Sequence, residues 1–215
     1  MTLVPLFPLP MVLFPGTVEL LHIFEPRYRR MLADILADDR QFGLLSTTPG
    51  TAEGAIPTGT VGTMARVETV QPLEDGRSNI AIRGLDRFVF RGFVESPAPY
   101  RVGEIERLPD SGPVASADRQ DQLNLLFTRA TRAARTLVDD HTPPPDLPMD
   151  GVARTYAMAQ LLDLPLPARI ELLVIPDSLA RTERLIAMVT RELPGLEARA
   201  ARHRAASSNG HGHHP

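Results

Sequence analysis

The spacing of hydrophobic and polar residues changes along the chain and predicts three kinds of segment. Up to about residue 108, apolar residues recur every second position in short runs, as in β-strands, whereas from residue 116 they recur at three and four, as in helices. The proline- and glycine-containing stretch 109–113 separates the two patterns. We therefore predict an α+β fold with a strand-rich region over 1–110, a helical region over 114–195 and a disordered tail over 196–215.

The first 36 residues predict a strand, a turn, a second strand and a helix. Prolines alternate with large apolar residues over 5–10, and because proline has no N–H to donate to a sheet, we expect an edge or bulged strand. Pro15-Gly16 favours a turn, and the apolar run 18–24 favours the second strand. Pro26 suits the first position of a helix, whose predicted apolar face consists of Tyr28, Met31, Leu32, Ile35 and Leu36.

The remainder of the first region predicts short strands joined by turns. A buried strand is expected over 41–46, a loop over 47–58, alternating strands from residue 59, and a hairpin at Asp75-Gly76. Gly84 predicts a bulge or barrel corner, and the last strand, 100–108, a bulge near Gly103. Six to eight strands of this length with one helix favour a closed or nearly closed barrel, because free strand edges need protection.

The second region predicts four helices that form a bundle. Their expected ranges are 116–140, 151–162, 167–174 and a last helix that begins after Asp177. Pro194-Gly195 is expected to end or kink the last helix, because proline removes a backbone donor.

Composition indicates an ordinary globular protein. The chain of 215 residues is 43% hydrophobic and 23% charged, and it contains no run of about 18 apolar residues and no signal-peptide pattern, so a cytoplasmic protein is expected. The formal net charge of −3 does not indicate a nucleic-acid binder, although the segment from Leu179 on has six Arg and only three Glu.

Two missing residue types exclude several chemistries. Without cysteine the chain has no disulfide, thiolate zinc site or cysteine nucleophile. All 23 basic residues other than histidine are arginine, so a P-loop lysine, a Schiff-base lysine and a Ser–Lys dyad are also excluded.

Several side chains offer chemistry, and each has a simpler structural interpretation. His22 and Glu25 suggest acid–base chemistry, but a hydrogen-bonded histidine and a helix-capping carboxylate explain them better. The hydroxyls at 46–48 lack a Gly-x-Ser-x-Gly context, and the histidines of the tail, His211, His213 and His214, lack a rigid setting for a metal. We therefore predict no catalytic, cofactor-binding or metal-binding residue.

Two groups of arginines could bind anions. Arg27, Arg29 and Arg30 lie on the first predicted helix, where a solvated face is the simpler interpretation. On one predicted hairpin, basic and aromatic residues alternate in a way that could clamp single-stranded nucleic acid. Core phenylalanines with outward arginines explain that pattern more simply; the residues are Arg83, Arg87, Arg91, Phe88, Phe90 and Phe93.

The order and spacing of short motifs resemble the stand-alone bacterial form of the Lon-type N-terminal substrate-binding domain. The resemblance covers roughly residues 3–193, and only the Glu-Leu-Leu before His22 departs from a Pro-Leu pair found in many relatives. The residues that carry it, which we take as structural or binding positions, are Phe7, Pro8, Phe14, Pro15, Gly16, His22, Phe24, Glu25, Arg27, Tyr28, Gly62, Gly84 and Phe88.

The resemblance implies a PUA-like pseudo-barrel that recognises unfolded or exposed apolar polypeptide segments. We expect binding without cleavage, because the chain stops before the ATPase and peptidase modules of the full-length protease and has no lysine for either. The proline-rich first strand and a groove between barrel and bundle are the candidate contact places. Such a module could deliver clients to a separate protease, act alone as a holdase, or regulate another protein.

One alternative is an RNA-binding PUA-like module, which the acidic barrel region argues against. A related small-ligand domain holds a cysteine-bound zinc, which this cysteine-free chain cannot do.

Overall fold

The computed structural model describes residues 1–143 and 145–209, and it consists of two compact units. The first unit combines residues 1–111 with residues 164–176, and the second combines residues 112–163 with the chain from residue 177 on. The division after Ser111 lies within the stretch 109–113 that separates the two sequence patterns. Each unit is described by itself below.

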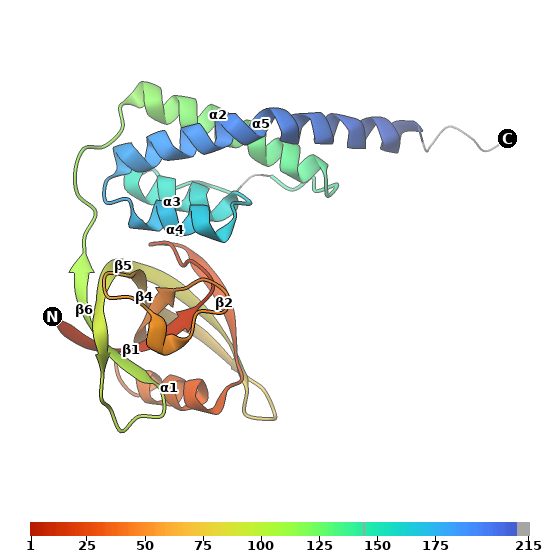
Figure 1. The fold of residues 1–215 in the computed structure, drawn as a ribbon. Coiled ribbons are helices and arrows are strands. Elements are labelled where there is room, and N and C mark those ends of the chain that lie inside the picture. Colours follow the sequence, from red (N-terminus) through yellow and green to blue (C-terminus); the bar gives the residue numbers. More distant parts are fainter. Residues whose placement is uncertain (144, 210–215) are drawn as a thin grey trace. The chain divides into compact units, whose positions relative to one another are not determined.

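The first unit contains a six-stranded sheet. Its strands are β1 (Thr2–Leu9), β2 (Val18–Ile23), β3 (Gln41–Ser46), β4 (Val61–Pro72), β5 (Ser78–Val94) and β6 (Arg101–Leu108). They are hydrogen-bonded in the order β2-β5-β4-β3-β1-β6, and β6 also pairs with β5, so only β2 has a single strand neighbour within the described chain (Figure 1). The number of strands agrees with the six to eight that were expected.

The prediction that the proline-rich first strand is an edge strand is wrong for the sheet as a whole. β1 lies between β3 and β6, but it changes partner along its length. Residues 2–6 pair with β6 and residues 6–9 pair with β3. Each half of β1 therefore has one unpaired side, which is the local condition that a proline without an N–H requires.

A core between the sheet and α1 (Pro26–Leu36) stabilises the first unit. Pro26 stands in the first turn of α1, as predicted. The apolar face of the helix packs into a cluster with β-strand residues, where each fully buried side chain contributes about 1.5–3 kcal/mol. The helix contributes Tyr28, Met31, Leu32 and Ile35, and the strands contribute Phe7, Phe42, Leu44, Ala65, Val67, Ile80 and Ile82.

The long strands β4 and β5 form the predicted hairpin. Gly76 in its turn has a φ of 78°, a left-handed conformation that glycine adopts without strain. The β4–β5 register shifts between the Thr63–Arg87 and Ala65–Gly84 pairs, which agrees with the irregularity expected at Gly84. The bulge expected near Gly103 lies on the partner strand instead, between Phe90 and Gly92.

α4 (Leu166–Val174) belongs to the first unit, so the prediction of one bundle of four helices is wrong. The physical reason is Arg87 on β5, which is 1% exposed. Its Nη1 donates to the carbonyl oxygens of Leu173 at 2.7 Å and Ile175 at 3.0 Å, and its Nη2 lies 3.2 Å from Asp110 Oδ1. These contacts hold the end of α4 against the strands.

The second unit contains α2 (Ala117–Thr136), α3 (Gly151–Leu161) and α5 (Ser178–Asn209). Asp150 and Asp177 cap the last two, because their carboxylates accept the backbone N–H of Ala153 at 2.8 Å and Ala180 at 2.6 Å. α2 and α5 lie side by side (Figure 1). At the centre of the unit the buried guanidinium of Arg181 stacks 3.7 Å from the ring centroid of Tyr156.

Pro194 lies inside α5 and does not end it, so the prediction of a disordered tail from residue 196 is wrong for residues 196–209. Ala200, which is 1% exposed, continues the buried face beyond the proline. Burial of that face outweighs the lost backbone donor. Residues 210–215, which include the three tail histidines, lie outside the described residues. None of the helices in the described ranges is long and apolar enough to cross a membrane.

Candidate functional site

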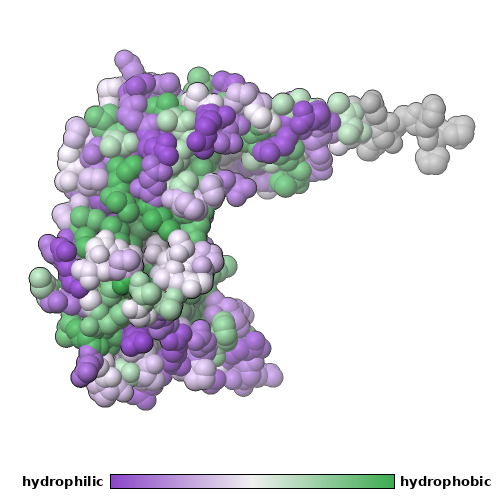
Figure 2. Space-filling model, viewed as in Figure 1, coloured by the Kyte–Doolittle hydropathy of each residue, from purple (hydrophilic) through white to green (hydrophobic). Residues whose placement is uncertain are grey.

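The outer face of β2 and the residue that follows it expose apolar side chains. Leu20 is 78% exposed, Phe24 57% and Val18 42%. His22, between Leu20 and Phe24, is also exposed. We name these four residues the β2 surface. Figure 2 shows that hydrophobic and hydrophilic residues are mixed on the visible face of the first unit.

The alternation of β2 explains why these side chains reach solvent. Successive side chains of a strand point to opposite faces, and here Glu19, Leu21 and Ile23 take the inner face. The Glu19 carboxylate lies 3.8 Å from the guanidinium of Arg169 on α4, and the positive charge of Arg169 compensates the negative charge of Glu19 on the inner face. The inner position of Glu19 leaves Val18 and Leu20 on the outer face.

A bulge at the Pro15-Gly16 turn fixes where β2 begins. Gly16 has a φ of 78°, and its N–H donates to the carbonyl of Gly84 at 2.8 Å, while Gly84 N–H donates to Thr17 at 2.9 Å. This two-against-one pairing with a left-handed glycine is the G1 bulge. Arg83 on β5 supports it by donating to the Gly16 carbonyl at 3.0 Å and by pairing with Glu68.

The structure does not bring His22 and Glu25 together as an acid–base pair. His22 Nδ1 lies 2.8 Å from Asn79 Oδ1 on β5, and its ring stacks on Phe24 with a centroid distance of 5.9 Å. Glu25 occupies the N-cap position of α1 without a side-chain capping bond. Its carboxylate instead accepts from Arg27 Nε at 3.0 Å.

Glu53 joins three side chains at the start of α1. It lies on the short 3-10 helix Glu53–Ala55, and its carboxylate contacts Arg27 Nη1 at 2.7 Å, accepts from the Tyr28 hydroxyl at 3.0 Å and contacts Arg101 Nε at 3.4 Å. Burial and the neighbouring Glu53 raise the pKa of Tyr28 above its ordinary value. Beside this group is an open depression of about 820 Å³, lined also by Phe93 and residues 94–100.

Most of the motif residues are buried or partly buried in the first unit. Phe7, Phe14, Tyr28 and Phe88 are buried, and Pro8, Pro15, Glu25 and Arg27 are partly buried. A Cβ at Gly62 would lie 2.4 Å from Phe88, and a Cβ at Gly84 would lie 2.2 Å from the Phe14 carbonyl, so both glycines allow close packing. Only Gly16, His22 and Phe24 are exposed.

The structure does not support the interpretation of the arginine- and phenylalanine-containing hairpin as a nucleic-acid clamp. Phe88 and Phe90 are in the core, and Arg87, expected to face outward, is buried by its bonds to the end of α4. The two outward arginines are paired with carboxylates, Arg83 with Glu68 and Arg91 with Glu106.

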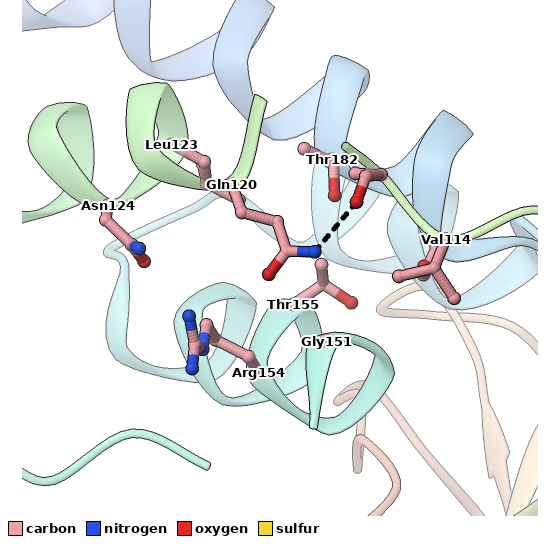
Figure 3. A pocket seen from close by; sticks show the side chains of 10 residues that line it. Val114, Gln120, Leu123, Asn124, Gly151, Arg154, Thr155 and Thr182 are labelled. Atoms are coloured by element: carbon pink, nitrogen blue, oxygen red, sulfur yellow. Dashed lines mark hydrogen bonds between the residues drawn. The ribbon is translucent and has the colours of Figure 1, made fainter. Parts of the chain in front are cut away.

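A small cavity of about 10 Å³, enough for a single water molecule, lies in the second unit (Figure 3). The side-chain amide of Gln120 extends along it and donates to the Ala115 carbonyl at 2.7 Å. The buried hydroxyl of Ser178 also lines it and has no hydrogen-bond partner among the described residues. The size of this cavity excludes a larger ligand.

Within 1–143 and 145–209, no group of three or more His, Cys, Asp or Glu side chains is placed to hold a metal ion. Apart from His22 and Phe24, sequence reasoning missed the exposed outer face of β2, because residues 18–24 were considered mainly as an apolar run. The signal was available: Glu19 interrupts the run, and strict alternation from it assigns Val18, Leu20 and His22 to one face.

Comparison with known proteins gives consistent matches. Over 210 residues the chain is 30% identical to "Lon protease 2" of Sorangium cellulosum (strain So ce56), covering 90% of this chain and 25% of that protein. It is 25% identical over 193 residues to "Lon protease 2" of Syntrophobacter fumaroxidans (strain DSM 10017 / MPOB), covering 87% of this chain and 24% of that protein. The chain thus spans about a quarter of the length of these relatives.

Two solved structures share the fold. The Lon N-terminal domain protein from Xanthomonas campestris matches with a TM-score of 0.64 and 29% identity, over 87% of this chain and 98% of that one. The N-terminal domain of a Mycobacterium avium complex Lon protease matches with a TM-score of 0.62 over 88% of this chain and 98% of that one. At 16% identity, the second match shows the fold alone.

The family model for the ATP-dependent protease La (LON) substrate-binding domain matches residues 3–191, which cover nearly all of the first unit and part of the second. The resemblance found in the short motifs is thereby confirmed. The chain belongs to the LON substrate-binding domain family.

Proposed function

We propose that this protein is a non-catalytic binding module that recognises exposed apolar segments of unfolded polypeptides. The observation that carries the proposal is the β2 surface, where Leu20 is 78% and Phe24 57% exposed in a domain whose family is named for substrate binding. Exposed apolar side chains rimmed by polar groups are typical of interaction sites. We further propose that the strand ring closed by the β5–β6 pairing is the PUA-like barrel of the family.

The charges around the β2 surface suit a polypeptide better than a nucleic acid. Near it, Arg83 is paired with Glu68 and Arg77 with Asp75, so their charges are balanced locally. Binding to RNA depends on arginines or lysines that neutralise phosphates. The RNA-binding alternative therefore gains no support from this surface.

The experiment that tests this function is a binding assay with an unfolded protein. The full chain is titrated into a fluorescently labelled, reduced and carboxymethylated α-lactalbumin, and anisotropy is measured, with native α-lactalbumin as a negative control. Leu20→Glu combined with Phe24→Glu should weaken binding about tenfold or more, since each buried apolar side chain contributes roughly 1.5–3 kcal/mol.

Leu125→Glu is the matched control, because Leu125 lies on α2 in the second unit and is 61% exposed. It adds the same charge at an exposed leucine outside the β2 surface and should leave the affinity unchanged. Equal affinities of all variants would show that the β2 surface is not the site. Failure of the unchanged chain to bind any unfolded protein would contradict the proposed function, and cleavage of the labelled protein would contradict its non-catalytic part.

A further inference from the structure

β2 has a free hydrogen-bonding edge. It is the end strand of the sheet order and pairs only with β5 among the strands of the described residues. Edge strands in stable proteins are commonly protected by proline, lysine or a bulge. β2 has neither proline nor lysine in its sequence, and its register with β5 shows no shift from Val18 to Ile23.

The direction of the backbone groups follows from the register. Gly84 exchanges hydrogen bonds with the Gly16–Thr17 bulge, and in an antiparallel pair bonded and non-bonded residues alternate from such a point. Glu19, Leu21 and Ile23 then turn their backbone groups toward β5. Val18, Leu20 and His22 turn theirs toward the free edge, and these are also the residues whose side chains face solvent.

We propose that the β2 edge binds one extended segment of an unfolded polypeptide by strand addition. This inference rests on the proposed function and adds how the client is held. The backbone of the client pairs with Val18, Leu20 and His22, and its alternate side chains lie beside Leu20 on the outer face. Recognition through backbone groups depends little on sequence, so the same edge can serve many clients.

The size of the edge favours a transient client over a second copy of the chain. The six residues of β2 together with Phe24 offer far fewer contacts than the roughly 20–30 residues a side that a stable protein interface needs. A folded partner also has few extended segments with unpaired backbone groups, whereas an unfolded chain has many. The edge is therefore suited to distinguish unfolded from folded polypeptide.

Two variants of Leu20 test strand addition directly. Leu20→Ala removes the side chain and keeps the N–H at the free edge, whereas Leu20→Pro removes both. Proline is tolerated on an edge strand where its nitrogen faces solvent, so Leu20→Pro should keep the β5 pairing and the fold, which thermal unfolding checks. Leu20→Pro should bind the labelled carboxymethylated α-lactalbumin about fivefold or more weakly than Leu20→Ala, since one hydrogen bond contributes about 1 kcal/mol.

A peptide gives a second test that does not depend on the folding of a variant. The probe is a labelled peptide of about ten residues, the upper range of strand length, in which leucine and threonine alternate. When the peptide adds antiparallel to β2, the residues whose N–H groups face β2 also place their side chains on the outer face beside Leu20. N-methylation of the leucines should therefore weaken binding about tenfold or more, through two or more lost hydrogen bonds, and N-methylation of the threonines should not.

Equal binding by Leu20→Ala and Leu20→Pro, or methylated peptides that bind as tightly as the unmodified one, would overturn strand addition while the proposed function stands. Failure of the unchanged chain to bind the unmodified peptide and the carboxymethylated protein would overturn both.

Discussion

The Tyr28 hydroxyl shows how one residue joins α1 to a surface loop. Its ring packs against Phe7 with a centroid distance of 3.9 Å, and its hydroxyl donates to Glu53 on the loop between β3 and β4. Ionisation of Tyr28 would place a phenolate beside that carboxylate inside the core. Burial, with the charge of Glu53, therefore raises the pKa of Tyr28, and burial raises the pKa of Tyr100 as well.

This raised pKa predicts a loss of stability at alkaline pH. In the unfolded state tyrosine ionises near pH 10, whereas Tyr28 in the folded state stays protonated to higher pH. The unfolded state then binds fewer protons, so the free energy of unfolding is unaffected below about pH 10 and falls as the pH rises above it. Urea unfolding between about pH 8 and about pH 11, a range that brackets the ordinary pKa of tyrosine, measures this loss of stability.

The absence of lysine makes the alkaline test clean, since no ammonium group titrates in the same range. Tyr28→Phe should make the pH dependence shallower, because it removes one titrating group and keeps the ring in the core, while Tyr100, whose pKa burial also raises, remains. A profile equally steep in Tyr28→Phe and in the unchanged chain would contradict the assignment.

At the scale of elements, the start of β2 depends on Gly84. The backbone of Phe14 approaches Gly84 so closely that an added Cβ would lie 2.2 Å from the Phe14 carbonyl oxygen. Gly84→Ala must therefore displace the turn before β2 and the bulge that sets its register. We expect the substitution to lower the free energy of unfolding by about 2 kcal/mol, as overpacking against a fixed neighbour does.

Gly54→Ala is the matched control for this prediction. Nothing lies within 4 Å of a Cβ added at Gly54, and its φ is not positive. Urea unfolding should give Gly54→Ala the stability of the unchanged chain. If Gly84→Ala unfolded at the same urea concentration as Gly54→Ala, the tight contact would not constrain the turn.

The sequence predicted where helices, turns and strands lie better than it predicted which of them pair or pack together. Local signals such as Pro26, Asp75-Gly76 and Asp177 placed a helix start, a hairpin and the beginning of the last helix correctly, because each acts within a few residues. The prolines of β1 indicated an edge strand because the sequence does not show that β1 changes partner at Leu6. Pro194 was misread for a similar reason, since the buried face that continues the helix to Ala200 depends on packing.

The same limit applied to the candidate site. Motif residues were predicted as structural or binding positions, and in the structure most of them are buried or partly buried. Arg87 was expected to face outward because arginine in an alternating strand is most often solvated. Its actual partners are carbonyl oxygens 86 and 88 residues away in the chain, which no local pattern reveals.

At the scale of the whole molecule, the first unit is discontinuous in sequence. The chain leaves it at Ser111, returns at residue 164 to form α4, and leaves again after Pro176. The two positions at which the chain leaves the first unit are linked by a hydrogen bond, which Ser111 N–H donates to the Pro176 carbonyl at 2.9 Å. The carbonyl oxygens of Leu173 and Ile175 compensate part of the buried charge of Arg87. A fragment of residues 1–111 does not contain these hydrogen-bond acceptors.

A fragment of residues 1–111 should therefore be less stable than the first unit in the full chain. A synthetic peptide of residues 164–176 should bind it and raise its unfolding temperature, because a ligand present at 100 times its Kd stabilises a protein by about 2.7 kcal/mol. Arg87→Met in the fragment should abolish this effect, whereas Arg91→Met, which breaks the exposed pair with Glu106, should preserve it. Differential scanning calorimetry with and without the peptide measures each case, and a fragment that the peptide does not stabilise would contradict the role assigned to Arg87.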